Sequence, residues 1–559
     1  MADTRADEYL RRFGVAENGR GIWNAHWQEI NDRVLARPGG FLTSVVQGSK
    51  ATQRMFDATA ALACQRLAAA IESVICPRSE RWHGLEPVDP ELADNQDVKA
   101  YCEKLTDLLF RVRYGARSAF ASETQECFLE LCAFGTHSML VDDMANHEGV
   151  YPQRPPIVYM AQPLAYLWIE ENELGQVDTL YRKFDYDGRQ ALQRFGDKTP
   201  AKVKDAAEKH SDRRFTFVQC VHPTDDYAGS AWDRRMFPYT SVVVSRDERE
   251  VVQEGGYRTI PYAVGRSITT ADEHYGRSPA MTLLPDIKML NEVGKSMIRQ
   301  VHKQLDPPLL IADDGSATPF DARPNALNYG SVDSQGRQLV HPLQTGGNLA
   351  MGQEFRQDLR AVINDGFYLK LFQILVETRE MTAYEAALRA QEKGILLAPM
   401  MGRQEAEFLG PLIERELDIL WSRGVIQRVV GPMPAALEAT GGQLKVAYTN
   451  QMAHFQRAPE ATRTLMAIQQ LAPLASLDPT VMDVFDPDGV AQVILDANGV
   501  PAKAQRSKAD VAAVRGQRQQ RQQASDILAT APVAASAAKD LASAQATAQQ
   551  QPAPPSLTP

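Results

Sequence analysis

Two long helical patterns flank a Pro/Gly-rich stretch in the middle of the 559-residue chain, and no other feature constrains the fold as strongly. In 286–304, apolar residues and one glycine recur every three to four positions (Ile287, Leu290, Gly294, Met297 and Val301). A second such pattern covers about 351–375 (Phe355, Leu359, Val362, Gly366 and Phe367). The spacing predicts two helices that each pack along one face. The stretch between them, 306–346, contains a Pro-Pro pair that ends the first helix and short strand candidates at 309–312 and 338–343.

The flanking regions differ in their patterns. Residues 1–150 read as helical, including an Ala-rich helix over 51–75 in which Phe56 takes part in the spacing. Runs rich in Val, Tyr, Phe and Thr between turn formers predict a β-rich segment at 150–267 with one short helix. A further helical region, 382–424, is expected to be interrupted near Pro399 and Gly402. Small helices follow in 456–500, and the Ala/Gln/Pro-rich residues 524–559 are expected to be disordered.

Composition places the chain among folded, water-soluble proteins, with 44% hydrophobic and 23% charged residues. No uninterrupted apolar run approaches the roughly 18 residues of a membrane span, and the N-terminus lacks the apolar region of a secretory signal. The six cysteines form no CxxC pair, which argues against a disulfide framework or a zinc site and favours a reducing compartment.

Charge is unevenly distributed along the chain. Residues 1–500 carry 53 basic and 67 acidic side chains, a net charge of −14, whereas the last 59 residues carry 7 and 3, a net charge of +4. Affinity for nucleic acid comes largely from neutralising phosphates, so the acidic part is a poor tight binder of DNA. This balance does not exclude a protein that DNA slides past.

Three motifs suggest catalysis or ion binding, but the residues around each motif do not support that function. The triplet Gly294-Lys295-Ser296 resembles the end of a phosphate-binding loop, but it lies inside a predicted helix that leaves no free backbone amides. The cluster Asp142, Asp143, His147 and Glu148 reads as a polar turn without identifiable supporting groups.

The third motif, Asp486-Pro487-Asp488-Gly489, would place Val484 and Leu495 at calcium-ligand positions, so a turn or a helix N-cap is expected there instead. The chain has no HExxH, GxSxG or GxGxxG sequence. These observations predict no enzyme activity, no catalytic or metal-binding residue and no cofactor.

Several blocks of the sequence occur in the order of a known family. YGRSPAMTLLPDIKMLNEVGK (275–295) resembles the head-to-tail connecting family, the portal proteins of short-tailed bacteriophages. Similar blocks occur at 56–85, 177–196, 382–393, 402–420, 451–460 and 485–501, so the resemblance spans about 25–520.

The resemblance implies an α+β portal-type fold assembled as a ring, with twelve subunits expected. It assigns 1–275 to an α/β wing, 276–305 and 347–376 to two stem helices, and 306–346 to a small β-containing clip. It further assigns 377–424 to a tunnel loop and a long wing helix, 425–502 to a helical crown, 503–523 to a basic helical extension and 524–559 to a disordered tail. Only about 376–381 is available for the tunnel loop, a short stretch for a large one.

The implied function is a structural head–tail connector in the virion, at one capsid vertex and assembled in the host cytoplasm. Double-stranded DNA would pass through its channel during packaging and ejection. The implied partners are further copies of the chain, the terminase large subunit, tail adaptor or tail tube proteins, and the major capsid and scaffolding or internal core proteins, with no membrane. The alternatives are a genome-processing enzyme, such as a nuclease or packaging ATPase, and a ring adaptor without a channel.

Within this scheme, individual residues receive expected roles. Basic residues of the second stem region are candidates for guiding DNA: Arg356, Arg360, Lys370 and Arg379. Gly294 and Gly366 lie on the apolar faces of the stem helices, where close helix packing would compensate for the low helix propensity of glycine. The clip strands are too short to form a core within one chain, so pairing with neighbouring subunits and docking of partners are expected there (Leu309, Leu310, Ile311 and Val340).

Overall fold

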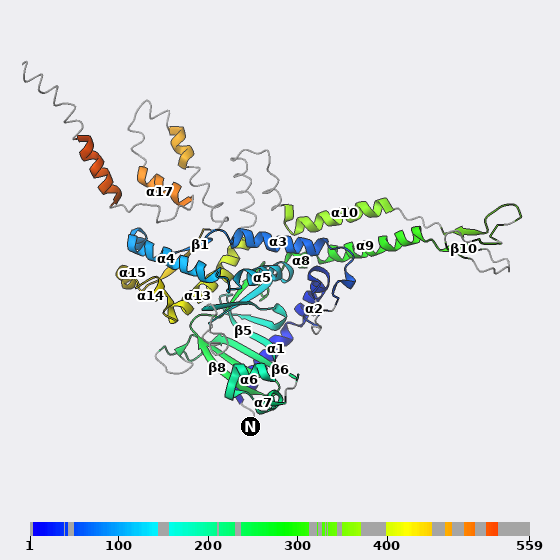
Figure 1. Cartoon of the computed structure of the whole chain (residues 1–559), viewed down its shortest axis with the longest axis horizontal. Coiled ribbons are helices and arrows are strands. Elements are labelled where there is room, and N and C mark those ends of the chain that lie inside the picture. Colours follow the sequence, from blue (N-terminus) through cyan, green and yellow to red (C-terminus); the bar gives the residue numbers. More distant parts are fainter. Residues whose placement is uncertain are drawn as a thin grey trace, which may run out of the picture.

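The computed structural model describes residues 4–37, 40–42, 48, 50–143, 156–209, 212–229, 236–311, 321, 323, 327–329, 331–332, 334–343, 349–370, 399–449, 464–471, 486–497 and 510–523. The fold mixes helices with antiparallel sheets, as the predicted α+β class requires. A central body carries two long helices that run side by side away from it and end at a small hairpin (Figure 1). Among the described helices, none has both the length and the hydropathy needed to cross a membrane.

The body is built around three helices and a three-stranded sheet. The helices are α3 (Thr59–Ile75), α4 (Gln96–Arg113) and α5 (Phe120–Phe134), and the strands are β2 (Thr136–Asp143), β3 (Ile157–Ala161) and β9 (Tyr262–Arg266). Strand β2 is central and antiparallel to both neighbours. The main hydrophobic core joins these elements with α2 (Gly21–Ile30).

A second, five-stranded antiparallel sheet extends the body. Its order is β4-β5-β6-β7-β8, with strands Leu167–Glu171, Val177–Asp187, Arg214–Pro223, Tyr239–Ser245 and Glu250–Tyr257. Helix α1 (Thr4–Gly19) packs on this sheet through Phe13, which contacts Trp168 and Tyr181. Two short helices, α6 (Gly188–Phe195) and α7 (Ala201–Glu208), lie at the end remote from the stem (Figure 1). Helix α6 begins with a capping box between Asp187 and Gln190.

The long helices and the hairpin follow α8 (Pro279–Thr282). They are α9 (Leu284–Leu305) and α10 (Leu349–Gly366), with β10 (Leu309–Ile311) paired antiparallel to β11 (Val340–Pro342) at the far end (Figure 1). We call α9 and α10 the stem, and β10 with β11 the clip. Gly294-Lys295-Ser296 lies within α9, as expected, so its backbone amides are used by the helix.

The C-terminal half returns to the body. A helix covers 399–404 and continues through a π-helical turn, η8 (Glu405–Leu409), into α13 (Gly410–Ser422). Helices α14 (Val425–Val429) and α15 (Ala435–Ala439) precede β12 (Leu444–Tyr448), which pairs with β1 (His83–Pro87). Beyond them lie helices at 464–471, α17 (Pro487–Ala497) and 510–523.

The structure differs from the sequence-based expectations in several local respects. Strands β1 and β2 fall within the region expected to be helical, and α7 adds a second short helix to the β-rich segment. Within the described residues 399–422, the helix runs through Gly402 without a break and carries a π turn at 405–409, whereas the residues before Pro399 lie outside the described ranges. Residues 425–448, expected in the crown, pack on the body, where Ile426 and Leu437 join its core.

Candidate functional site: the stem, its junction with the body and the clip

The stem is buried near the body and uncovered farther out. Ile287 and Leu290 of α9 and Leu359 and Ile363 of α10 are buried in the main core. Toward the clip the same helices carry exposed apolar side chains (Ile298, Val301 and Leu305 on α9, and Met351 and Phe355 on α10). Leu305 and Met351 are 80% and 70% exposed. Within the described residues, the outer stem therefore presents an exposed apolar surface.

A loop of the body joins the two stem helices at one point. Asn291 of α9 accepts hydrogen bonds through Oδ1 from the backbone N–H groups of Phe56 (3.0 Å) and Asp57 (3.2 Å). Arg360 of α10 donates from Nε (3.0 Å) and Nη2 (2.7 Å) to Oδ2 of Asp57. The sequence-based expectation placed Phe56 inside a helix, but α3 begins at Thr59, and residues 56–57 lie in the preceding loop.

The basic residues expected to guide DNA occupy different environments. Arg360 is paired with Asp57, and Arg356 is half-buried on α10. Lys370 is exposed, lies beyond the end of α10 and pairs with Asp365 at 2.7 Å. Arg379 lies outside the described residues. Among the three described cations, the structure thus ties Arg360 to the body and leaves Lys370 in solvent.

The two stem glycines have different neighbours. A Cβ atom at Gly294 would lie 3.5 Å from Cβ of Phe56, which is ordinary contact. A Cβ atom at Gly366 would lie 2.6 Å from Cδ2 of Leu283, closer than side chains pack. Gly366 therefore allows α10 to approach the residue that precedes α9, whereas Gly294 faces the loop of the body.

In the clip, the two short strands pair with each other within the chain. Leu309 pairs with Pro342, and Ile311 pairs with Val340. Leu310 is about half-exposed at 53%, and Val340 is half-buried. Exposed apolar residues nearby extend this surface (Leu327, Tyr329, Val332 and Leu343).

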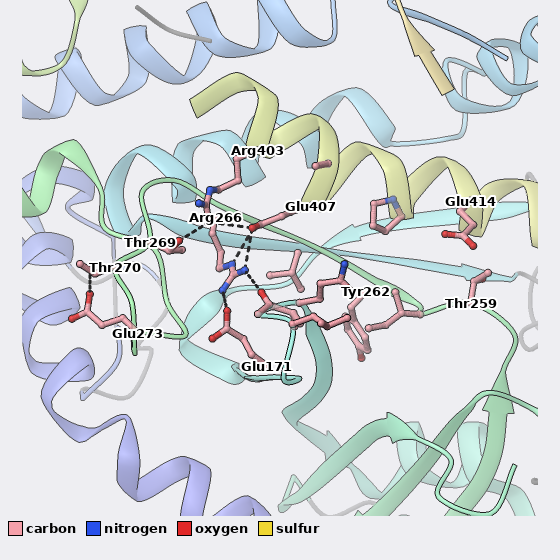
Figure 2. A pocket seen from close by; sticks show the side chains of 18 of the residues that line it. Glu171, Thr259, Tyr262, Arg266, Thr269, Thr270, Glu273, Arg403, Glu407 and Glu414 are labelled. Carbon is pink, nitrogen blue, oxygen red and sulfur yellow. Dashed lines mark hydrogen bonds and ion pairs between the residues drawn. The ribbon is translucent and has the colours of Figure 1, made fainter. Parts of the chain in front are cut away.

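One cleft lies on the body, away from the stem. It has a volume of about 1080 Å³ and lies between the β4–β5 turn, residues 258–273 and the helix at 399–414. Figure 2 shows Arg266 at its floor, pointing toward Glu171 and Glu407.

Arg266 is saturated by these neighbours. Its Nε and Nη2 each donate to Glu407 at 3.0 Å, and its remaining N–H groups reach Glu171 and the backbone oxygens of Gly175 and His274. Because all five N–H groups are used, Arg266 keeps no donor for a ligand. The cluster instead ties the π turn at 405–409 to the end of β9.

Acidic clusters noted in the sequence also have structural partners. Asp143, at the end of β2, pairs with Arg423, whereas His147 and Glu148 lie outside the described residues. Asp486 accepts from the backbone N–H of Asp488 at 3.0 Å at the start of α17, as expected for a helix cap. Within the described ranges, no group of three or more His, Cys, Asp or Glu side chains is arranged to hold a metal ion.

Sequence reasoning missed Asp57, Asn291, Arg266 and Glu407. The motif Asp-Ala-Thr at 57–59 is a helix-start signal that would have moved the beginning of α3. Nothing local in the sequence indicates the partners of the other three residues.

Comparison with known proteins identifies the family. The family model for the bacteriophage head to tail connecting protein matches residues 6–505. The chain is 28% identical over 524 residues to the probable portal protein of Bordetella phage BPP-1. The aligned region covers 92% of this chain and 91% of that relative. It is 25% identical over 558 residues to the portal protein of Salmonella phage epsilon15. Here the aligned region covers 98% of this chain and 97% of that relative.

A solved chain from the neck of a native GTA particle, computed with C12 symmetry, is 10% identical and has a TM-score of 0.32. The superposed region covers 73% of this chain and 85% of the solved chain. At this TM-score the likeness supports no inference. The family match, in contrast, extends over the body, the stem and the clip. The chain therefore belongs to the family of bacteriophage head-to-tail connecting proteins.

Proposed function

We propose that this chain is the portal subunit of a tailed bacteriophage. Copies of it form a ring at one vertex of the capsid, with twelve subunits expected, and double-stranded DNA passes through the central channel during packaging, retention and ejection. The observation that carries this proposal is the stem, a helix pair that projects from the body with apolar side chains uncovered along its outer part. Exposed apolar stripes of this kind are covered by a neighbour in an assembly.

The charge of the chain suits a channel. The first 500 residues carry a net charge of −14, and an acidic wall holds DNA weakly because few phosphates are neutralised. Arg356 and Lys370 are the described cations we assign to guiding the duplex, together with Arg379 by its place in the sequence.

We assign the partner proteins to opposite ends of the molecule. We assign docking of the terminase large subunit and of tail adaptor or tail tube proteins to the clip, through Leu309, Leu310, Ile311 and Val340. The body would contact the major capsid and scaffolding or internal core proteins. The protein is then a structural component of the virion, assembled in the host cytoplasm.

The proposal is tested on the apolar face of the stem. Phe355→Glu combined with Val362→Glu places two charges on half-exposed apolar positions of α10. We expect the rings to dissociate, with at least a tenfold loss of ring material in analytical ultracentrifugation and an unchanged far-UV circular dichroism spectrum.

The matched control is Gln353→Glu, which adds a charge at an exposed polar position of the same helix. The control should form rings like the wild type. Full ring assembly by the double variant would contradict the proposed role of the stem.

A further inference from the structure

We propose that Asp57, Asn291 and Arg360 form a joint that fixes the angle of the stem against helix α3, and that Arg360 is a positioning residue of this joint. The inference rests on the proposed function, because a fixed stem angle matters for a channel. We call these three side chains the stem joint.

The α9 side of the joint is a buried amide. Asn291 is 7% exposed, and its Oδ1 accepts the N–H groups of two successive residues, Phe56 and Asp57. An amide oxygen has two lone pairs, so this acceptor is fully used. The loop before α3 is thereby held on α9 through the backbone N–H groups of the loop, independently of the side chains of the loop.

The α10 side of the joint is a charge pair. The Asp57 side chain is 3% exposed, and its Oδ1 accepts from the backbone N–H and the hydroxyl of Thr59 at 3.0 and 2.5 Å. Its Oδ2 accepts hydrogen bonds from Nε and Nη2 of Arg360. One carboxylate therefore starts α3 and anchors α10, and removing the arginine would leave a buried charge with fewer partners.

Helix length turns this small contact into a large effect. Leu305 lies 14 residues beyond Asn291, which corresponds to roughly 21 Å of helix. By simple geometry, a tilt of about 10° at the joint would move the clip end by roughly 4 Å. A side chain at the joint can thus set the position of distant clip residues without touching them.

Arg360 differs in this respect from Lys370. Both are cations near the end of the stem with a carboxylate partner, but Lys370 pairs with Asp365 in the same segment, and both of those side chains are exposed. Of these two pairs, the Arg360 pair connects a stem helix to the body. Lys370→Met is therefore a matched control for Arg360→Met.

The test measures the stem angle in the full chain. Spin labels at Ala69→Cys on α3 and Gln353→Cys on α10 occupy exposed positions, and all six native cysteines are buried and protected from labelling. Labelled chains are diluted into unlabelled chains so that each assembly carries one labelled copy. Pulsed electron paramagnetic resonance then gives the distance distribution between the two sites.

We expect a narrow distribution in the wild type and in Lys370→Met. Arg360→Met should broaden it at least twofold, and so should Asp57→Asn, which keeps an oxygen for Thr59 but loses the charge. Arg360→Lys should restore part of the narrow distribution. Equal widths in the wild type, Arg360→Met and Asp57→Asn would overturn the joint.

A second readout separates positioning from DNA contact. Rings of Arg360→Met and of the wild type are compared for DNA binding between 50 and 300 mM salt. A joint predicts the same salt dependence for both, whereas a phosphate contact predicts a shallower slope in the variant and would overturn the assignment. If the wild type forms no rings, the proposed function fails, but the distance measurement on the monomer still decides the joint.

Discussion

Glu130 of α5 is a carboxyl group in an apolar site, and it makes stability depend on pH. It is 5% exposed, and its Oε2 accepts the backbone N–H of Leu164 at 3.2 Å. Burial raises the pKa of Glu130 to about 8, and the nearby Glu126 adds to this shift.

In the unfolded chain the pKa of this group lies near 4.5, so folding takes up a proton between pH 4.5 and 8. The free energy of unfolding should therefore fall as the pH rises through that window and level off above it. Glu130→Gln removes the titration. The difference in free energy of unfolding between Glu130→Gln and the wild type should therefore shift in favour of the variant from pH 5 to pH 8.5. We expect this shift to be at least about 2 kcal/mol in urea unfolding. Parallel pH profiles for the two proteins would contradict this reading.

The two stem glycines should respond differently to alanine. Gly294→Ala meets only ordinary contact with Phe56, so the better helix propensity of alanine should stabilise the chain by up to about 1 kcal/mol. Gly366→Ala places its Cβ atom against Leu283, and that buried side chain must move. Urea unfolding of both variants checks the order. A Gly366→Ala variant as stable as Gly294→Ala would show that Leu283 adapts freely.

At the scale of elements, periodicity predicted the stem well. The apolar spacing of 286–304 matches α9, because a helix that buries one face must repeat every three to four residues. Periodicity carries no information on distant partners, and Asn291 lies 234 residues from Asp57. The π turn at 405–409 was missed for the same reason, since its partner Arg266 lies 141 residues away.

The clip offers a test of partner docking. Within the described residues, its two three-residue strands pair with each other and with no third strand, and a two-stranded hairpin is marginal by itself. Deletion of 309–343 should leave a soluble protein with an intact body, because the main core lies elsewhere. Pull-down assays with the terminase large subunit and the tail adaptor should show loss of both. Unchanged binding of both partners by the deleted chain would remove the clip from the docking site.

At the scale of the whole molecule, charge separates the tail from the rest. The segment 503–523 carries six basic residues and one acidic residue, and 510–523 is helical. Arg515 of this helix pairs with Asp488 of α17 at exposed positions, a contact of small energy.

Truncation after Pro501 should therefore leave ring assembly intact and change the amount of DNA that particles package or retain. Nuclease protection of encapsidated DNA, measured against the full-length chain, checks this. Wild-type packaging and infectivity with residues 1–501 alone would show that the basic segment is dispensable.

Electron microscopy of the purified full-length protein decides whether the chain is a ring-forming channel subunit. Averaged end-on views should show a closed ring, with twelve subunits expected, and a central opening wide enough for a DNA duplex. Side views should show the stems converging on a narrow clip end. A population of compact monomers, or closed particles without a central opening, would contradict the account.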